Sequence, residues 1–543
     1  MKKLSLLLLV FTSLALSKTY EIKYERLYNG KPIDEKIIIN SDDIVLFSKD
    51  GDKEKLYADH DEEISVKMLD TGDKIFRVET PFSDFPEPKI EDSDLEILGY
   101  KCKKGVYYVF SNKVEIWFTT EADIKGSPWY QNFPQNSLVL KYVVNGNYTA
   151  VAKSIEEVED FKLPEYLEAD QETVTEAKYQ RMVIDSRYIT MNIFDREQVY
   201  FDGDFVNEPI DDLSKVYHFS KGTVVMKKVT LPKDYYNYYI FAKLTNWSNG
   251  DSYDRVGSLF TFSSKDDTFL KALENGLDKL PVFKANNGKE YQGVMKTGDY
   301  YPLIDLMRFY TSFGVSHFNS KSVIDGYNWQ DSVVYKQEIT ELIEDREIWV
   351  GVFIGNYDKG GHKVSLELDL YPQYSEEKIE RYIEPLFNTV NIMEMSGQNY
   401  GTLFKGDTLE VEFNLPENVK NLQLRFTTTG HGGWGSGDEF TKHVNKIVID
   451  GNEIFRIIPW REDSGTYRMS NPASGNFGNG LSSSDLSRSN WSPATLTTPY
   501  YIPLYELKSG KHKLKLIIDQ GDDEGNMHNS WNVSGVLIGI VED

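Results

Sequence analysis

Apolar and polar residues alternate at period two along much of the chain, and helical periodicity is scarce. The alternation is clearest in four stretches: 364–370, 409–415, 422–426 and 514–518. Such a pattern predicts strands with one buried face and one solvated face. Asn145-Gly146 and Asp450-Gly451 each stand between apolar runs, where they predict tight hairpin turns. We therefore expect an all-β protein built from β-sandwiches or jelly rolls.

The pattern divides the chain into three blocks. Residues 18–185 form a strand-rich, acidic accessory block, and residues 186–371 form the first expected jelly roll. Residues 376–543 form the second, after a connector that contains Tyr371-Pro372 and a short charged run. The stretch 430–492 is rich in Gly and Ser. Loops that long within a β-sandwich commonly carry binding or catalytic function.

The first 17 residues have the pattern of a bacterial signal peptide. A basic start, an apolar run at 4–11 and a small-residue exit at 15–17 predict cleavage near residue 17. The apolar run is too short to span a bilayer. We therefore expect an exported protein, secreted or periplasmic, that does not insert into the membrane.

Composition and charge limit the kinds of molecule that the protein can bind and the ways in which it can be stabilised. A formal charge of −25 repels phosphate backbones, so nucleic acid is not an expected partner. Aromatic residues make up 13% of the chain, which fits sugar-facing surfaces and a β-rich core equally well. Cys102 is the only cysteine, so the sequence offers neither an intrachain disulfide nor a cysteine-based zinc site. We expect a monomer whose stability rests on its apolar cores.

The motifs missing from the sequence leave carboxylates as the candidate catalytic groups. It contains eight histidines but no HExxH motif, and it has no GxSxG elbow, P-loop or dinucleotide-binding glycine motif. The histidines are best interpreted as structural or surface residues. Any reaction is therefore expected to use Asp and Glu side chains, without a metal or an organic cofactor.

Two acidic segments are candidates for chemistry. In the segment 249–255, Asp254 lies between Tyr253 and Arg255, so an aromatic surface and a cation flank one acid. The alternative is a turn with a surface ion pair. In the segment 430–440, five glycines surround Trp434 and two acids, the second of which is Glu439. Glycines allow close backbone approach to a bulky ligand, but a plain surface loop is the alternative.

Both segments resemble those of the peptide-N-glycosidase F family. Asp251-Ser252-Tyr253-Asp254-Arg255 stands where that family has Asp-x-Trp-Asp-Arg, so Asp254 matches the family's catalytic aspartate and Tyr253 replaces a tryptophan. Glu439-Phe440 matches a Glu-Trp pair, and Arg488-Ser489-Asn490-Trp491-Ser492-Pro493 matches an Arg-x-x-Trp segment with a following proline. The resemblance covers about 186–543, in the same order.

The resemblance implies an amidase that hydrolyses the amide between asparagine and the innermost GlcNAc, releasing the glycan and leaving aspartate. It implies that Asp254 acts on the water and the leaving nitrogen, and that Glu439 orients the inner sugar and the water. Arg488 would hold these carboxylates or face the oxyanion. The remaining expected substrate-binding residues are Tyr253, Arg255, Phe440, Trp491 and Trp434. Longer members of the family carry a bowl-shaped N-terminal domain, which the block 18–185 would match.

The chain also departs from the family pattern. The family's cysteines near both motifs are absent. A family glutamate in a Glu-x-Trp segment falls at Gly355, with Tyr357 in place of the tryptophan, unless Asp358 serves from a shifted position. We expect the loss of that side chain to open space near the innermost GlcNAc, so that core-fucosylated glycans would be tolerated.

Three other functions remain open from the sequence. A non-catalytic glycan-binding double jelly roll would use the same aromatic residues but would release nothing. A copper monooxygenase would need clustered His and Met ligands, whereas His317 and His362 are isolated in the sequence. A glycosidase that cuts between sugars would leave a GlcNAc on the peptide. The amidase interpretation requires that Asp254 and Glu439 converge in one cleft.

Overall fold

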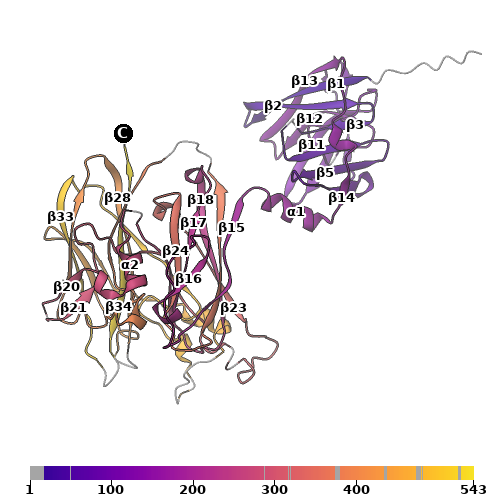
Figure 1. The fold of residues 1–543 in the computed structure, drawn as a ribbon. Coiled ribbons are helices and arrows are strands. Elements are labelled where there is room, and N and C mark those ends of the chain that lie inside the picture. Colours follow the sequence, from indigo (N-terminus) through magenta and orange to yellow (C-terminus); the bar gives the residue numbers. More distant parts are fainter. Residues whose placement is uncertain are drawn as a thin grey trace, which may run out of the picture. The chain divides into compact units, whose positions relative to one another are not determined.

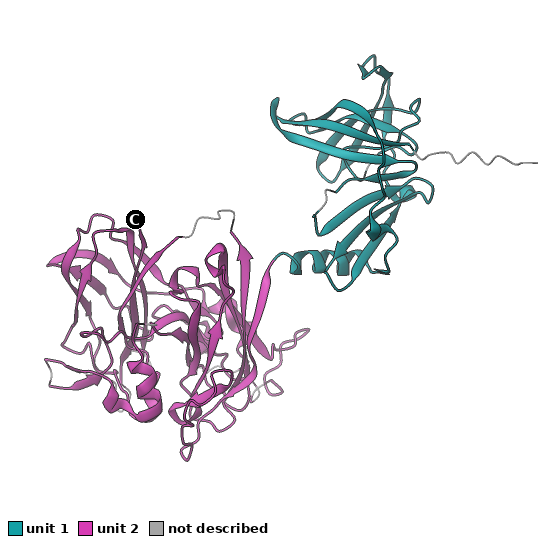
Figure 2. Ribbon diagram, turned by 45° about the horizontal axis from the view of Figure 1, so that its top comes forward, with its two compact units in different colours: residues 1–187 teal, residues 188–543 magenta. Residues whose placement is uncertain are grey.

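The computed structural model describes residues 18–48, 51–131, 133–263, 265–286, 288–315, 317, 319–373, 379–432, 437–472, 479, 481–523 and 528–542. The expected signal peptide and Trp434 lie outside these residues. The chain separates into two compact units, Met1–Arg187 and Tyr188–Asp543, which Figure 2 shows in teal and magenta. We describe each unit by itself.

The first unit is built on one twelve-stranded sheet in the order β14-β6-β5-β4-β3-β2-β1-β13-β12-β11-β10-β7. Its strands are β1 (Thr19–Tyr28), β2 (Lys31–Ser41), β3 (Ile44–Leu46), β4 (Glu54–Asp59), β5 (Ile64–Asp70), β6 (Ile75–Pro81), β7 (Lys89–Glu91), β10 (Lys103–Val109), β11 (Asn112–Thr119), β12 (Leu138–Val144), β13 (Tyr148–Val158) and β14 (Gln171–Thr173). A small ribbon of β8 (Glu96–Ile97) and β9 (Tyr100–Lys101), the 3-10 turns η1 (Phe82–Asp84) and η2 (Glu165–Leu167), and helix α1 (Glu176–Asp185) complete it. The predicted β-rich character of this block is confirmed.

The second unit begins with a β-sandwich. One sheet is β15 (Ile189–Val199), β25 (His362–Pro372), β18 (Tyr238–Ser248) and β23 (Ser332–Glu338). The facing sheet is β16 (Val216–Phe219), β17 (Val224–Thr230), β24 (Glu347–Ile354), β19 (Val256–Thr261), β22 (Ile304–Tyr310) and β31 (Leu496–Thr497). Alternation places side chains as predicted, because the four apolar residues of the stretch 364–370 are fully buried between the sheets.

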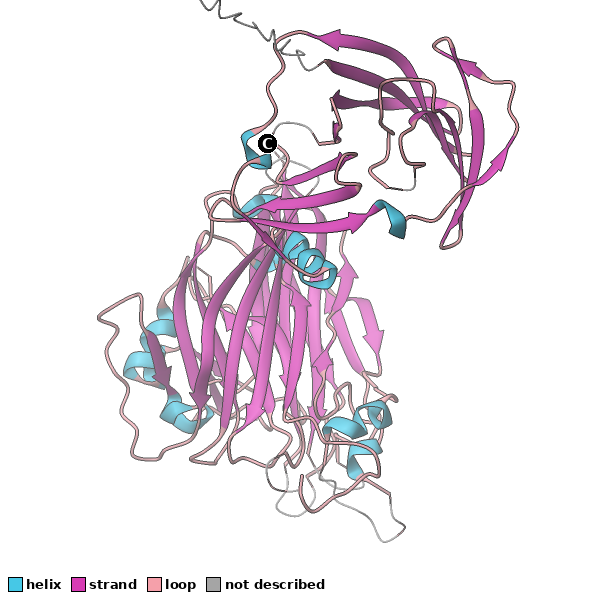
Figure 3. Ribbon diagram, turned by 90° about the vertical axis from the view of Figure 1, so that its right-hand side faces the viewer, coloured by secondary structure: helices cyan, strands magenta, loops and turns pink. Residues whose placement is uncertain are grey.

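A second sandwich follows, and Figure 1 shows its strands beside those of the first, while Figure 3 shows that strands predominate over helices. Its sheets are β26 (Arg381–Asn388), β34 (Ser530–Val541), β28 (Val419–His431) and β32 (Tyr500–Pro503), against β27 (Leu409–Leu415), β33 (Gly510–Ile518), β29 (Asn445–Ile449) and β30 (Asn452–Ile457). Shorter elements of the unit are β20 (Val282–Lys284), β21 (Glu290–Gln292), α2 (Thr268–Asn275), η3 (Ser220–Gly222), η4 (Tyr235–Asn237), η5 (Leu277–Lys279), η6 (Thr340–Leu342), η7 (Glu394–Ser396), η8 (Ser464–Ser470) and η9 (Ser483–Asp485). The predicted all-β class is confirmed.

Segments from each half of the second unit enter the other half. Strand β31 follows most of the second sandwich in the chain but pairs with β22 of the first. Conversely, Tyr291 and Val294 pack in the core of the second sandwich. Ile383, Val536 and Ile538, from β26 and β34, are buried in the apolar core of the first. The two sandwiches therefore share a packed seam.

Buried arginines reinforce this seam. Arg425 on β28 donates from Nη1 to the carbonyl of Asp305 (2.7 Å) and from Nη2 to that of Leu306 (3.1 Å). Arg308 on β22 donates in the other direction, to the carbonyl of Asn532 (2.9 Å), and pairs with the Asp305 carboxylate (2.6 Å). Because a guanidinium has fixed donor geometry, these bonds hold the two sandwiches in one register. Within the residues described, no helix is long and apolar enough to cross a membrane.

We predict that Arg425→Leu lowers the free energy of unfolding by about 3 kcal/mol. Two buried carbonyls lose their donors, and an unpaired buried polar group costs about 1–3 kcal/mol. Urea unfolding followed by fluorescence measures the change. The matched control is Arg456→Leu, since Arg456 is exposed and pairs with Glu453 on the surface. A change below about 0.5 kcal/mol is expected there, and equal effects of the two variants would contradict the role given to the seam.

Candidate active site

The loop that carries Asp254 connects β18 to β19 and is held from several sides. The Thr311 hydroxyl accepts from the backbone N–H of Arg255 (2.8 Å) and donates to the carbonyl of Tyr253 (2.9 Å). The N–H of Gly314 donates to the carbonyl of Ser252 (2.7 Å). These bonds fix the backbone on both sides of Asp254, so its carboxyl is presented from a rigid loop.

Asp251 anchors the same loop through its buried carboxylate. Its carboxylate is buried and receives Nε of Arg255 at 2.7 Å and Nη2 at 3.3 Å. The His362 Nε2 atom lies 3.7 Å away. Burial alone would raise the pKa of Asp251, but His362 and Arg255 outweigh burial and bring the pKa to about 2. Asp251 therefore remains ionised and holds Arg255 in place.

Glu439 is held by the neighbouring backbone of the second sandwich. Its N–H donates to the carbonyl of Gly432 (3.3 Å), and its carbonyl accepts from the N–H of Ser489 (2.9 Å). The preceding acid, Asp438, is fully buried and accepts from Trp531 Nε1 (2.6 Å). Because Ser489 also donates its hydroxyl to the carbonyl of Asp438 (2.5 Å), the segments around 438 and 489 lie side by side. This pairing brings Arg488 to Glu439.

Arg488 joins the two candidate acids. Its Nε donates to Oε1 of Glu439 at 2.9 Å, and its Nη2 lies 4.0 Å from Oδ2 of Asp254. The arginine side chain is only 2% exposed, whereas those of Asp254 and Glu439 are 20% and 18% exposed. The two acids, from different sandwiches, therefore approach one buried guanidinium and remain open to a ligand.

The third nitrogen of Arg488 is a buried donor that needs an acceptor. Among the described residues, Nη1 has no hydrogen-bond partner. An unsatisfied buried N–H is costly, and such atoms in a cleft are candidate ligand contacts. The site therefore combines two acids with one unused charged donor.

Burial shifts the protonation of both acids. Desolvation raises the pKa of Glu439 to about 7; the charge of Asp254 adds to the rise and Arg488 opposes it. Desolvation also raises the pKa of Asp254, again against Arg488. With a pKa of about 7, Glu439 is suited to proton transfer near neutral pH.

The aromatic residues predicted for this site have two different placements. Tyr253 and Tyr357 are each 57% exposed, and the Arg255 guanidinium lies over both rings, at 4.8 Å and 5.4 Å from their centroids. Tyr253 also stacks on Phe313 at 6.3 Å. We call Tyr253, Arg255 and Tyr357 the platform. Its exposed rings can pack against a sugar face.

Trp491 and Phe440 instead flank Arg488, whose Cζ lies 4.9 Å and 5.2 Å from their ring centroids. Trp491 is only 3% exposed and donates to the carbonyl of Gly430 (3.0 Å). It stacks on Tyr310 of the first sandwich at 4.4 Å. Trp491 was expected to line the sugar site, but the structure places it in the seam, because its ring fills the space behind the guanidinium. It supports Arg488.

At Gly355 the structure differs from the open space expected from the sequence. A Cβ built on Gly355 would lie 3.5 Å from Oε2 of Glu394, a residue of the second half of the unit. Asp358, the alternative acid, accepts from the N–H groups of Gly360 (2.7 Å) and Gly361 (3.0 Å), so its carboxylate builds a turn. The acid beside Gly355 is therefore Glu394.

The sequence gives no role to three residues of this site. Asp251 stands in the motif of Asp254, and Asp438 precedes Glu439, but no sequence pattern indicates that both are buried. Glu394 carried no signal, because Met393-Glu394-Met395 matches no catalytic or binding motif. Its proximity to Gly355 is a tertiary contact.

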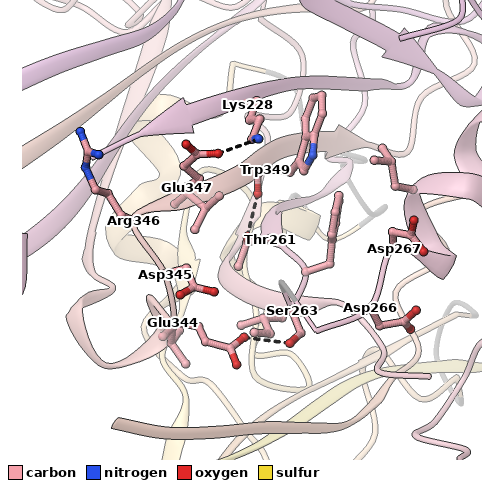
Figure 4. A pocket seen from close by; sticks show the side chains of 15 residues that line it. Lys228, Thr261, Ser263, Asp266, Asp267, Glu344, Asp345, Arg346, Glu347 and Trp349 are labelled. Carbon is pink, nitrogen blue, oxygen red and sulfur yellow. Dashed lines mark hydrogen bonds and ion pairs between the residues drawn. The ribbon is translucent and has the colours of Figure 1, made fainter. Parts of the chain in front are cut away.

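A large cavity of the first sandwich lies away from these residues. It has a volume of about 560 Å³ and lies where β19 ends and β24 begins, whereas Asp254 precedes β19 and Gly355 follows β24. Figure 4 shows its acids, of which Glu347 pairs with Lys228 and Glu344 accepts from Ser263. The cavity is therefore at the opposite end of these strands from the candidate active site. In the described parts of the chain, no three His, Cys, Asp or Glu side chains are grouped to hold a metal ion.

Comparisons with known proteins cover both units. Residues 190–370 match the family model described as Peptide-N-glycosidase F, N terminal, and residues 399–538 match Peptide-N-glycosidase F, C terminal. Residues 22–180 match N-glycanase peptide, N-terminal domain. A search of curated proteins finds no match.

Among solved structures, PNGF-II in space group P21 is 39% identical, with a TM-score of 0.86 over 97% of this chain and 100% of that one. PNGF-II in space group C2 is also 39% identical, with a TM-score of 0.81 over 97% and 99% of the two chains. PNGase F, a glycosylasparaginase from Flavobacterium meningosepticum, is 13% identical, with a TM-score of 0.43 over 66% and 96%. That last likeness is too weak to support any conclusion.

We predict that Glu439→Gln becomes stabilising as the pH rises. Below pH 4.5, the usual pKa, residue 439 is neutral in both proteins, folded or unfolded. Between pH 4.5 and about 7 the unfolded wild-type chain ionises while the folded one stays protonated, so the wild type loses stability. The advantage of the variant should grow across this window and level off above it. Urea unfolding of both proteins from pH 4 to 8 measures it, and a difference that does not change with pH would contradict the burial argument.

Proposed function

The chain belongs to the peptide-N-glycosidase F family, and on that premise we propose that it hydrolyses the amide between asparagine and the innermost GlcNAc of N-glycoproteins and glycopeptides. The glycan leaves as a glycosylamine, and the asparagine becomes aspartate. The observation that carries the proposal is the approach of Asp254 and Glu439, from separate sandwiches, to the one buried guanidinium of Arg488.

Amide hydrolysis at this site has three requirements. A water must lose a proton as its oxygen attacks the amide carbon, the resulting oxyanion must be stabilised, and the departing nitrogen must gain a proton. We assign Asp254 to accept the proton from water and to return it to the nitrogen. The proton count then balances, since the water proton leaves with the amine and the hydroxyl stays on the new carboxyl group.

Glu439 and Arg488 complete this assignment. With a pKa near 7, Glu439 can either donate or accept a hydrogen bond at neutral pH, which suits it to orient the inner sugar and the attacking water. The unused Nη1 of Arg488 is a charged donor available to the oxyanion, while Nε holds Glu439. The reaction as assigned uses only side chains of the protein.

The platform of Tyr253, Arg255 and Tyr357 would receive the sugar. Aromatic rings pack against the apolar faces of sugars, and both exposed rings contact Arg255, the residue after Asp254. We also propose that Trp434, which precedes Glu439 in the sequence and lies outside the described residues, contacts the substrate. We assign no ligand to residues 18–185.

A non-catalytic glycan-binding protein is the second candidate. It would keep the platform, but it would have no use for two partly desolvated acids with raised pKa values around one arginine. Mass spectrometry of a defined glycopeptide separates the candidates. An amidase converts Asn to Asp with the whole glycan released, a lectin changes neither, and a glycosidase leaves a GlcNAc behind.

We also propose that the protein is exported by residues 1–17 and acts as a monomer outside the cytoplasm, either in the periplasm or as a secreted protein. The support is the basic start and apolar run of that segment. The same pattern suggests a bacterial source. The division of the chain into residues 18–185, 186–371 and 376–543 stays a prediction.

Asp254→Asn should abolish glycan release while the fold survives. Loss of a group that transfers the proton typically costs about 10²–10⁴ in rate. Release from a glycopeptide is followed by mass spectrometry, and thermal unfolding confirms the fold. Asp267→Asn, an exposed acid paired with Lys271, is the control and should keep full activity. Turnover of Asp254→Asn within about tenfold of wild type would remove Asp254 from the mechanism.

Tolerance of core fucose stays a prediction that rests on Gly355, which follows β24 and carries no side chain, although Glu394 narrows the space beside it. Gly355→Glu and Gly355→Gln should each lower kcat/KM at least about tenfold more for a core-fucosylated glycopeptide than for a plain one, since about 1.4 kcal/mol of steric cost is a factor of ten. The Gln variant separates the effect of bulk from the charge repulsion with Glu394 that Gly355→Glu would introduce. An unchanged ratio of the two activities would refute the prediction.

A further inference from the structure

One carboxylate reaches the edge of the Asp254 loop and has no part in the chemistry above. Glu394, the first residue of η7, accepts a hydrogen bond at Oε1 from the Tyr357 hydroxyl (2.6 Å). Its Oε2 lies 3.5 Å from the position of a Cβ on Gly355. Gly355 in turn donates its N–H to the carbonyl of Val256 (3.0 Å), two residues after Asp254. Glu394 therefore lies at the edge of the platform, beside Gly355.

The turn that presents Glu394 is rigidly held. Ile392 and Met393 are fully buried in a cluster with Phe353 of the first sandwich. The N–H of Met393 donates to the side chain of Gln398 (3.1 Å), which is itself buried. The carboxylate is therefore positioned in advance of any ligand, as a contact that discriminates between ligands must be.

Glu394 has acceptor capacity that the protein does not use. Among the described residues, Tyr357 is the only side chain that hydrogen-bonds its carboxylate, and no Lys, Arg or His forms an ion pair with it. An ionised carboxylate offers about four acceptor sites. Partial burial without a paired cation is unfavourable unless a ligand supplies donors.

Gly355 makes room for this arrangement. Its φ is not in the left-handed region, so its backbone does not require glycine. A Cβ would meet Phe353 at 3.3 Å and Glu394 at 3.5 Å, and a longer side chain would extend into the place of the Glu394 carboxylate. Gly355 and Glu394 thus act as a pair, in which the missing side chain admits a carboxylate from a distant segment.

From this geometry we propose that Glu394 determines specificity in the amidase reaction by accepting a hydrogen bond from a hydroxyl group of the bound glycan. The proposal rests on the proposed function. A sugar whose face packs on the platform directs hydroxyl groups to the platform's edge, where Glu394 lies. Hydrogen bonds to a charged acceptor are stronger than those between neutral groups, so one such contact discriminates well.

The experiment compares Glu394→Ala, Glu394→Gln and Tyr357→Phe in the full chain, with a glycopeptide as substrate. Glu394→Ala should raise KM roughly tenfold to hundredfold, the loss expected for a hydrogen bond to a charged group, with kcat within about threefold. Glu394→Gln keeps an acceptor without the charge, so its KM should lie between those of Glu394→Ala and the wild type. The control is Ser396→Ala on the same turn, where the exposed side chain should be dispensable.

Inhibition by the released glycan and by the unglycosylated peptide identifies which part of the substrate Glu394 contacts. The inhibition constant of the released glycan should rise with Glu394→Ala by about the same factor as KM, whereas that of the unglycosylated peptide should not change. Thermal unfolding verifies that each variant is folded.

Three results would overturn the proposal. An unchanged KM would show that Glu394 makes no substrate contact. A weaker inhibition by the peptide but not by the glycan would show that it contacts the peptide. An equal effect of Tyr357→Phe and Glu394→Ala would show that Glu394 acts only by holding Tyr357. If the wild type releases no glycan, the proposed function fails. The contact of Glu394 with the glycan is then tested separately, by calorimetric binding of the free glycan to wild type and variants.

Discussion

A single buried guanidinium organises the candidate active site. Two carboxyl groups at close range in a partly desolvated cleft repel each other when both are ionised, and burial penalises each charge further. Arg488 offsets both effects, because it bonds Glu439 directly and lies 4.0 Å from Asp254. The balance leaves both acids with raised pKa values, and that of Glu439, at about 7, lets this residue carry a proton near neutral pH. Phe440 and Trp491 cover the faces of the guanidinium and keep it in place.

This arrangement depends on the fixed packing of two sandwiches. Asp254 comes from a loop of the first sandwich, whereas Glu439 and Arg488 come from loops of the second. A small rotation between the sandwiches would separate the acids. The seam prevents it, through apolar side chains shared between the cores and through Arg308 and Arg425, which bond backbone carbonyls across it. Rigidity of this kind lets loops carry a site that requires sub-ångström placement.

The seam also explains how distant segments come together around the platform. Tyr253, Arg255 and Tyr357 belong to the first sandwich, while Glu394 belongs to a turn between β26 and β27 of the second. The turn reaches Gly355 because Ile392 and Met393 are buried among residues of the first sandwich. Packing in the seam thus builds both the reacting centre and the surface beside it.

The sequence by itself determined the strands and pointed to the candidate acids. Period-two alternation encodes which face of a strand is buried, since successive side chains point to opposite sides, and the stretch 364–370 follows it. The segments around Asp254, Glu439 and Arg488 were recognisable because each packs several chemically specific residues into a short stretch. The tertiary structure alone decided that Trp491 lies behind Arg488 and that Asp358 is engaged in a turn. It alone brought Glu394 to Gly355. These outcomes depend on which surfaces of separate sandwiches meet, and local patterns carry no information about contacts between residues far apart in the chain.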